Sequence, residues 1–246
     1  MGYIVVILVL IVIVIQYLNY KRNMELLSSV STPERGTRAE RRLIIKLQKL
    51  GVHPKAIFHD LYLQKNNGEY TQIDLIVATP QGLITIEVKD YSGWIFGNEN
   101  QKYWTQLLNY GKEKYRFYNP IKQNEGHIKA LQEQSLQFAN LPIFNVVLFA
   151  GNCTLKDVTY ISANTYVGYD NDIAYILNKI SELDLAVYTD KREVASSLRR
   201  AVNNGDNQEI VSNHLFTTRR NSVGTPPPKI DYTIDIFRFN RRLFRF

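Results

Sequence analysis

Three charged side chains stand in two otherwise apolar runs between Ile73 and Lys89. Asp74 lies in the first run, "IDLIVA", and Glu87 and Lys89 end the second, "GLITIEVK". Carboxylates are the ligands that a hard divalent cation prefers, and such a cation polarises a phosphoryl oxygen and lowers the pKa of a bound water. An ammonium beside the two carboxylates can orient that water or stabilise developing negative charge. Together these residue types predict hydrolysis of a phosphodiester bond.

The turn between the two runs decides whether the carboxylates meet. In "TPQG", Pro80 is pre-set for the second turn position, but proline cannot adopt the positive φ of the tightest hairpin turns. We therefore expect a four-residue loop around a type I turn, which pairs Ala78 with Leu83. The same register places Asp74 opposite Glu87, with their Cβ atoms about 5 Å apart.

Lys89 lies two residues beyond Glu87 on the same face of the predicted hairpin, about 7 Å further along the strand. The opposite face is then wholly apolar, with Ile73, Leu75, Val77, Ile84, Ile86 and Val88. A slip of one residue would mix the two faces, so the pattern favours this register. Spacing alone also permits a simpler arrangement, a cross-strand cluster of ionic side chains on a solvated face.

An amphipathic helix is predicted before the hairpin, in the segment "STPERGTRAERRLIIKLQKLG". We expect Thr32 to cap it, Pro33 to lie in its first turn and Gly51 to follow its end. Apolar residues at helical spacing form one stripe, which consists of Ala39, Leu43, Leu47 and Leu50. Glu40 lies at the margin of that stripe, where a simple solvated residue at the flank of the helix is the alternative to a role in the site.

Strands and helices alternate along the rest of the chain. Runs with strand character cover 56–64, 93–97, 102–109 and 115–118, and a near-continuous apolar run at 143–151 is typical of a strand buried on both faces. A second helix is expected over 119–140, with Asn119 as its cap and Pro120 as its first residue. A further strand is expected at 158–162, and helices at about 171–181, 190–203 and 207–219. This order predicts an α/β domain.

Four of these segments resemble, in order, the blocks of the NERD (nuclease-related) domain within the PD-(D/E)xK, restriction-endonuclease-like superfamily. They are "QIDLIV", "GLITIEVKDYSGWIFG", the tryptophan of "KYWTQ", and "NPIKQNEGHIKAL". The resemblance covers about 36–140 and continues more weakly through 143–150. It implies a restriction-endonuclease-like mixed sheet flanked by helices. The proline that usually precedes the superfamily's aspartate is absent, because Ile73 stands there.

The resemblance also implies a set of site residues. It makes Asp74 and Glu87 the ligands of Mg²⁺ or Mn²⁺, Lys89 the catalytic lysine, Glu40 an acidic helper from the first helix, and Gln123 a polar group that faces the site from the second helix. His127 lies one helical turn after Gln123 and therefore on the same face. For His127 we expect a satisfied polar residue at a helix–sheet contact.

The first residues predict a membrane anchor. Residues 2–15 are apolar apart from the Tyr3 hydroxyl, and no charge precedes Lys21. This stretch approaches the roughly 17–25 residues that span a bilayer. It lacks the basic start and the small-residue cleavage site of a signal peptide. Because basic residues follow the span and none precedes it, we expect a single-pass protein of the cell membrane with its C-terminal part in the cytoplasm.

Charge and cysteine content narrow the partners and exclude several classes. Lys and Arg outnumber Asp and Glu by 30 to 23, which favours nucleic acid or an anionic membrane as a partner, with a solvated basic surface as the alternative. Trp94, Phe96 and Trp104 can stack on bases, although burial is the commoner fate of such residues. A single Cys153 excludes an intrachain disulfide and a cysteine-based zinc cluster. No metalloprotease, P-loop, dinucleotide or G-x-S-x-G motif occurs.

These observations divide the chain into a transmembrane anchor at 1–20, a tether at 21–32, a nuclease-related domain at 33–220, a Pro/Gly linker at 221–229 and a basic aromatic tail at 230–246. The tail suits contact with nucleic acid, an anionic membrane, or the domain itself as a terminal strand. We expect a membrane-anchored, metal-dependent nuclease acting on DNA, with RNA as second choice. The alternative is a catalytically silent module that binds nucleic acid or a protein at the membrane.

Overall fold

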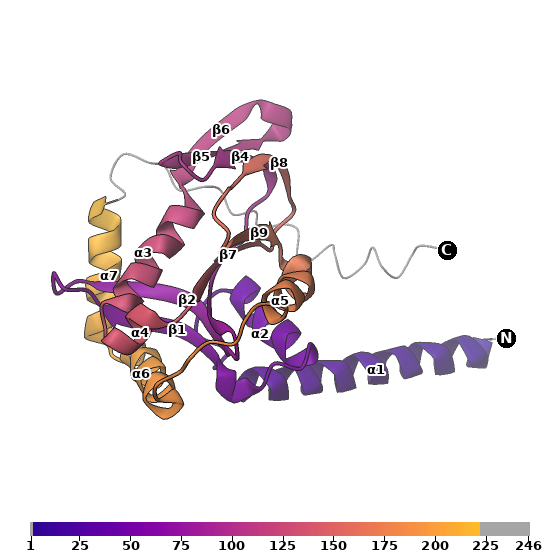
Figure 1. Cartoon of the computed structure of the whole chain (residues 1–246). Coiled ribbons are helices and arrows are strands. Elements are labelled where there is room, and N and C mark those ends of the chain that lie inside the picture. Colours follow the sequence, from indigo (N-terminus) through magenta and orange to yellow (C-terminus); the bar gives the residue numbers. More distant parts are fainter. Residues whose placement is uncertain (1, 222–246) are drawn as a thin grey trace.

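A five-stranded mixed sheet forms the centre of the domain (Figure 1). The structure is a computed structural model that describes residues 2–221, so the linker and tail predicted at 221–246 lie outside the described residues except for Asn221. The strand order is β1 (Ile57–Gln64), β2 (Tyr70–Thr79), β3 (Gly82–Lys89), β7 (Ile143–Phe149) and β9 (Thr165–Tyr169). The first three strands are antiparallel, and β7 and β9 run parallel to β3. Every residue of β7 is buried, as its apolar run predicts.

A second sheet of four strands was not expected as a separate layer. Its order is β6 (Glu113–Tyr118), β5 (Tyr103–Leu108), β4 (Gly93–Asn98) and β8 (Cys153–Thr159). The chain leaves the first sheet after Lys89 and turns at Gly93, where φ is +77°. A side chain at Gly93 would lie 2.2 Å from the Leu107 carbonyl oxygen, so glycine is needed to start the new sheet there.

Helices cover both faces of the five-stranded sheet. On one face lie α2 (Arg38–Lys49) and α5 (Ile173–Ser181). On the other lie α3 (Pro120–Gln132), α4 (Leu136–Asn140) and α6 (Lys191–Asn204). The helix predicted over 119–140 is therefore two helices, and α7 (Gln208–Asn221) follows α6. Sequence patterns missed β9, whose five residues are too short for a clear alternation.

The hairpin register agrees with the prediction, and its loop is shorter than expected. Ala78 pairs with Leu83, and one further pair joins Thr79 to Gly82. Four residues of the predicted apolar face (Leu75, Val77, Ile84 and Ile86) lie in one core cluster with α2 and α5, and Val88 packs at its edge. The placement of Ile73 on that face is wrong, because Ile73 packs in the core cluster on the opposite side of the sheet.

The cap predicted for the first domain helix is also wrong. Thr37, not Thr32, caps α2: its hydroxyl accepts from the Glu40 N–H, and the Glu40 side chain accepts from the Thr37 N–H. This is a capping box, Thr-x-x-Glu. Gly36, with φ of +63°, turns the chain just before the cap. Gly51 follows the helix with φ of +93°, as predicted.

The N-terminal helix α1 (Gly2–Ser28) projects from the body of the molecule (Figure 1). Over Tyr3–Ser28 it is long and apolar enough to cross a membrane, by length and composition. It continues through most of the predicted tether, and its last turn packs on α2. Leu27 is buried there, and the Gln48 amide donates to the Leu26 carbonyl oxygen at 2.7 Å.

Candidate active site

The two predicted ligand carboxylates lie where the β2–β3 hairpin opens. The hairpin ladder ends at the pair Leu75 and Ile86, and Asp74 and Glu87 are the next residues on each strand. The Asp74 carboxylate accepts a 2.8 Å hydrogen bond from the Val88 N–H. This bond fixes the carboxylate against β3, and both carboxyl groups are buried.

Lys89 and Gln123 join Glu87 in one polar chain. The Lys89 ammonium donates to Glu87 Oε1 at 2.5 Å and to Gln123 Oε1 at 3.0 Å. Gln123 reaches the site from the first turn of α3, so the structure brings together the hairpin and helix residues that the sequence singled out. The Lys89 side chain is 14% exposed, which leaves little water to weaken these contacts.

His127 lies closer to the site than expected. Its Nδ1 is 2.8 Å from the Thr71 hydroxyl, as a satisfied helix–sheet histidine would be. Its Nε2, however, lies 3.4 Å from Glu87 Oε2. The two atoms are near enough for an ion pair with a protonated histidine but are not aligned as a hydrogen bond. Both are buried without a hydrogen-bond partner among residues 2–221.

The buried charges move the pKa values of Glu87 and Lys89 in opposite directions. Burial alone would raise the pKa of Glu87, but the Lys89 ammonium and His127 outweigh it and lower that pKa to about 2. Burial would lower the pKa of Lys89, and the Glu87 carboxylate outweighs this effect and raises it. The pair is therefore ionised at neutral pH.

Asp74 has the opposite environment to Glu87. Burial raises the pKa of Asp74 well above its usual range, and the negative charges of Glu87 and Glu40 raise it further. Lys89 and the Val88 N–H oppose this shift without cancelling it. Neighbouring titratable groups whose environments move their pKa values apart are typical of functional sites.

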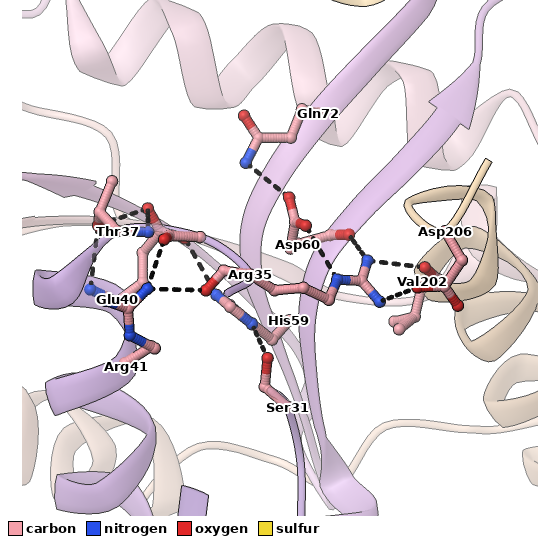
Figure 2. A network of polar contacts seen from close by, with 11 residues as sticks. Ser31, Arg35, Thr37, Glu40, Arg41, His59, Asp60, Gln72, Val202 and Asp206 are labelled. Atoms are coloured by element: carbon pink, nitrogen blue, oxygen red, sulfur yellow. Dashed lines mark hydrogen bonds and ion pairs between the residues drawn. The ribbon is translucent and has the colours of Figure 1, made fainter. Parts of the chain in front are cut away.

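Glu40, on α2, is engaged in structural contacts with Thr37 and His59 (Figure 2). Its Oε1 accepts from the Thr37 hydroxyl at 2.7 Å, and its Oε2 lies 3.1 Å from His59 Nε2. Burial would raise the pKa of Glu40, but the bonds from His59 and Thr37 outweigh it and lower that pKa. Glu40 therefore acts on Asp74 through its charge, and no direct contact joins the two.

The residues that hold Glu40 were not predicted from the sequence. His59 lies in β1, and its Nδ1 is 2.6 Å from the Ser31 hydroxyl, in the segment between α1 and α2. Next to it, Asp60 has φ of +57° in the middle of the strand. Figure 2 shows the Asp60 carboxylate between Arg35 and Gln72, at 3.1 Å from each. The signal was present: "HD" interrupts an apolar strand, as Asp74 does in the next one.

Buried asparagines hold α3 against the sheet. The Asn124 amide donates to the Thr85 carbonyl oxygen at 2.8 Å and to Asn145 Oδ1 at 2.9 Å. Asn145, in β7, donates in turn to the Ile121 carbonyl oxygen at 3.1 Å. These bonds fix the helix over β3, and the positions of Gln123 and His127 follow from them.

The donors at the hairpin suit a hard divalent cation. Asp74 and Glu87 supply carboxylate oxygens, and Glu87 Oε2 is a buried acceptor without a donor. Mg²⁺ commonly binds through one or two carboxylates and keeps several waters. Among residues 2–221 no group of three His, Cys, Asp or Glu side chains comes together as a metal cluster. A cation bound here would have Asp74 and Glu87 as protein ligands and would keep waters in its other positions.

Comparison with known proteins identifies the family of the chain. The family described as nuclease-related domain, NERD, matches residues 35–150. An uncharacterized protein of Bacillus anthracis is 32% identical over 151 residues, which cover 61% of this chain and 69% of that protein. No solved structure matches this chain. The matched residues contain the hairpin, α3 and β7, so the chain belongs to the nuclease-related domain (NERD) family.

Proposed function

We propose that this protein is a membrane-anchored nuclease that hydrolyses phosphodiester bonds in DNA, or else RNA, with Mg²⁺ or Mn²⁺. Membership of the nuclease-related family supports the nuclease part of the proposal. A restriction-endonuclease-like arrangement is consistent with the mixed sheet and its flanking helices. The length and apolar character of α1 support the anchor, and Lys21 and Arg22 after its apolar part favour a cytoplasmic domain.

The observation that carries the proposal is the hydrogen bonding of the two Glu87 carboxylate oxygens. One carboxylate oxygen is bound by Lys89, and the other is buried without a hydrogen-bond donor. Leaving a buried acceptor unpaired is costly. A cation shared with Asp74 would satisfy this oxygen, and its charge would remove the cost of ionising Asp74.

Each residue then has a defined task. Asp74 and Glu87 would hold the cation, which supplies polarisation of the phosphoryl oxygen and a lowered pKa of water. Lys89 stabilises negative charge that builds up on the phosphoryl group. Gln123 accepts from the ammonium and fixes its direction. His127 lies beside Glu87 and limits the directions from which its free oxygen can be approached.

The alternative, a nuclease-like module that binds without cutting, is favoured by one observation. The described residues supply only two clustered carboxylates, and Lys89 already neutralises one of them. Such a module would retain the fold and the basic surface but would take up no metal. Fold alone does not separate the two functions.

A metal titration separates them. Calorimetry of the full chain in detergent should show uptake of Mg²⁺ or Mn²⁺, and labelled DNA or RNA should be cut only when metal is present. Asp74→Asn should lose both properties, because an amide is a poorer ligand for a hard cation. Asp184→Asn, on an exposed loop, is the matched control and should keep both. Absence of metal uptake by the parent protein would contradict the nuclease and favour the binding module.

A further inference from the structure

The outward face of the second sheet carries an unusual set of side chains. Strand residues alternate between faces, and Ile95, Trp104 and Phe117 point inward and are buried. Trp104 stacks on Phe149 with nearly parallel rings, at 6.3 Å between centroids, so the prediction of a buried fate is confirmed for this tryptophan. The residues between these inward ones form the opposite face, which we call the platform.

Aromatic rings recur along the platform in neighbouring strands. On β4 they are Trp94 and Phe96, and on β5 and β6 they are Tyr103 and Tyr118. Tyr103 pairs in register with Tyr118, with ring centroids 6.1 Å apart. Trp94 and Phe96 are half-buried, and Tyr118 is 44% exposed.

Cationic side chains surround these rings. Lys156 Nζ lies 5.2 Å from the centroid of the Trp94 ring, and Lys102 Nζ lies 5.5 Å from that of Tyr103. Lys114 and Arg116 are exposed on β6, next to the β5 positions between the rings. Within the described part of the chain none of these four cations forms an ion pair. Asp157 is the acidic side chain beside them.

A solvated face of an antiparallel sheet is normally polar. In Figure 1 the second sheet lies at the far end of the molecule from α1, and no described helix covers its outer side. Contiguous apolar surface rimmed by polar groups marks an interaction site. Here the rim is cationic, so the partner should combine flat apolar groups with regularly spaced negative charge.

We propose that the platform binds single-stranded nucleic acid, with bases stacked on Trp94, Phe96 and the paired tyrosines and phosphates beside Lys114, Arg116 and Lys156. This rests on the proposed function and names its substrate class. Bases of a single strand offer both ring faces, whereas in a duplex these faces are stacked on one another. Aromatic rings beside cations are the features with which proteins hold single strands without sequence preference.

Chain connectivity places the second sheet next to the candidate site. Lys89 precedes Gly93, the first residue of β4, by four positions, so their Cα atoms are at most about 14 Å apart. Tyr118, the last residue of β6, precedes Gln123 by five positions. The candidate site and the sheet that carries the platform are thus joined by two short links.

The test is equilibrium binding without metal, so that no cleavage is required. Fluorescence anisotropy of labelled single-stranded and duplex oligonucleotides of equal length is measured with the full chain in detergent and EDTA. Trp94→Leu keeps an apolar side chain but removes the stacking ring, and should weaken single-strand binding by about 5- to 150-fold. The double substitution Lys114→Glu with Arg116→Glu should also weaken single-strand binding. It should make the plot of log affinity against log salt less steep, by at least about 1.4 in the magnitude of the slope.

Lys49→Glu with Lys55→Glu is the matched control, since these lysines are also exposed and lie outside the platform. It should leave affinity and salt slope close to those of the parent. Unchanged single-strand affinity in the platform variants, or an equal loss for duplex, would overturn the proposal. So would variants that change only the oligomeric state or only the binding to anionic vesicles. If the parent never cuts but the variants lose single-strand binding, the platform stands and the nuclease proposal fails.

Discussion

At the scale of single residues, the site depends on the contrast between Asp74 and Glu87. The two carboxylates lie on facing strands, yet Glu87 is ionised by its contact with Lys89, and Asp74 is pushed toward its neutral form. A divalent cation would reverse the second effect, because its charge favours the ionised carboxylate. In the metal-free protein, ionisation of Asp74 is therefore unfavourable, at the position where metal is expected.

Replacing Asp74 should stabilise the metal-free protein. Its folded pKa is raised above the unfolded value of about 4, so the folded state binds more protons and stability is lost as pH rises through the folded pKa. Asp74→Asn removes this loss and can still accept from the Val88 N–H. Thermal unfolding in EDTA should show a higher midpoint than the parent at pH 8 and a smaller difference at pH 4.

Glu87→Gln should shift the thermal unfolding midpoint in the opposite direction to Asp74→Asn. Its folded pKa of about 2 lies below the unfolded value, so its stabilising effect is present at neutral pH and disappears as pH falls toward 2. The substitution also leaves the buried Lys89 ammonium without its partner. The midpoint at pH 8 should fall. Equal shifts of the same sign in both variants would contradict the charge arrangement described here.

Asp60 shows that local backbone strain accompanies the site. It lies opposite Asp74 in register, between the pairs His59–Leu75 and Leu61–Ile73, and its φ of +57° is unfavourable for a residue with a side chain. Asp60→Gly and Asp60→Ala both remove the contact with Arg35, but only alanine keeps the strain. Chemical denaturation should find the alanine variant less stable than the glycine variant by about 1 kcal/mol. The reverse order would show that the left-handed conformation costs nothing.

At the scale of elements, local patterns predicted the hairpin and buried strands well because each signal lies within a few residues. The alternation around "TPQG" determines which residues pair, and the apolar run of β7 indicates burial on both faces. The second sheet was not predicted, because it depends on how the chain turns at Gly93 and pairs β4 with the distant β8. The face on which Ile73 lies was mispredicted for a similar reason. The change of face is accompanied by the irregular backbone of Asp60, and Asp60 lies on another strand.

The cap of α2 was mispredicted although its signal is local. Both Thr32 and Thr37 precede the helix, and only Thr37 has a glutamate three residues later. Thr37→Ala should lower the free energy of unfolding by about 1 kcal/mol. It should also remove the hydrogen bond from the Thr37 hydroxyl to the Glu40 carboxylate. Thr32→Ala, the matched control, should have little effect. Comparable destabilisation by the two substitutions in urea unfolding would contradict the capping box.

At the scale of the whole molecule, α1 and the domain form a connected unit. The last turn of α1 packs on α2, and the segment that follows places Ser31 on His59 and Arg35 on Asp60. Arg35 also donates to the Val202 carbonyl oxygen at 2.8 Å and so reaches α6. An anchor connected in this way would hold the domain in one orientation at the membrane surface.

The proposed orientation is directly measurable. Basic residues follow the apolar part of α1, and this bias sets the direction of insertion. A fluorescent reporter fused after Phe246 should therefore be cytoplasmic and protected from protease added outside intact cells. In a control variant, Lys21 and Arg22 are both replaced by Gln and two lysines are placed before Tyr3. Part of the reporter should then lie outside the cell and be open to protease. An external reporter on the parent chain would remove the proposed access to cellular nucleic acid.

The most direct test of the central claim is single-turnover cleavage by Lys89→Ala with Mg²⁺, measured beside calorimetric metal binding. The ammonium is not a metal ligand, so Mg²⁺ should bind at least as tightly as in the parent, while cleavage slows by about 10²- to 10³-fold. Lys49→Ala should cut at the parental rate. A purified Lys89→Ala protein that binds Mg²⁺ and cuts as fast as the parent would contradict the assignment of this site.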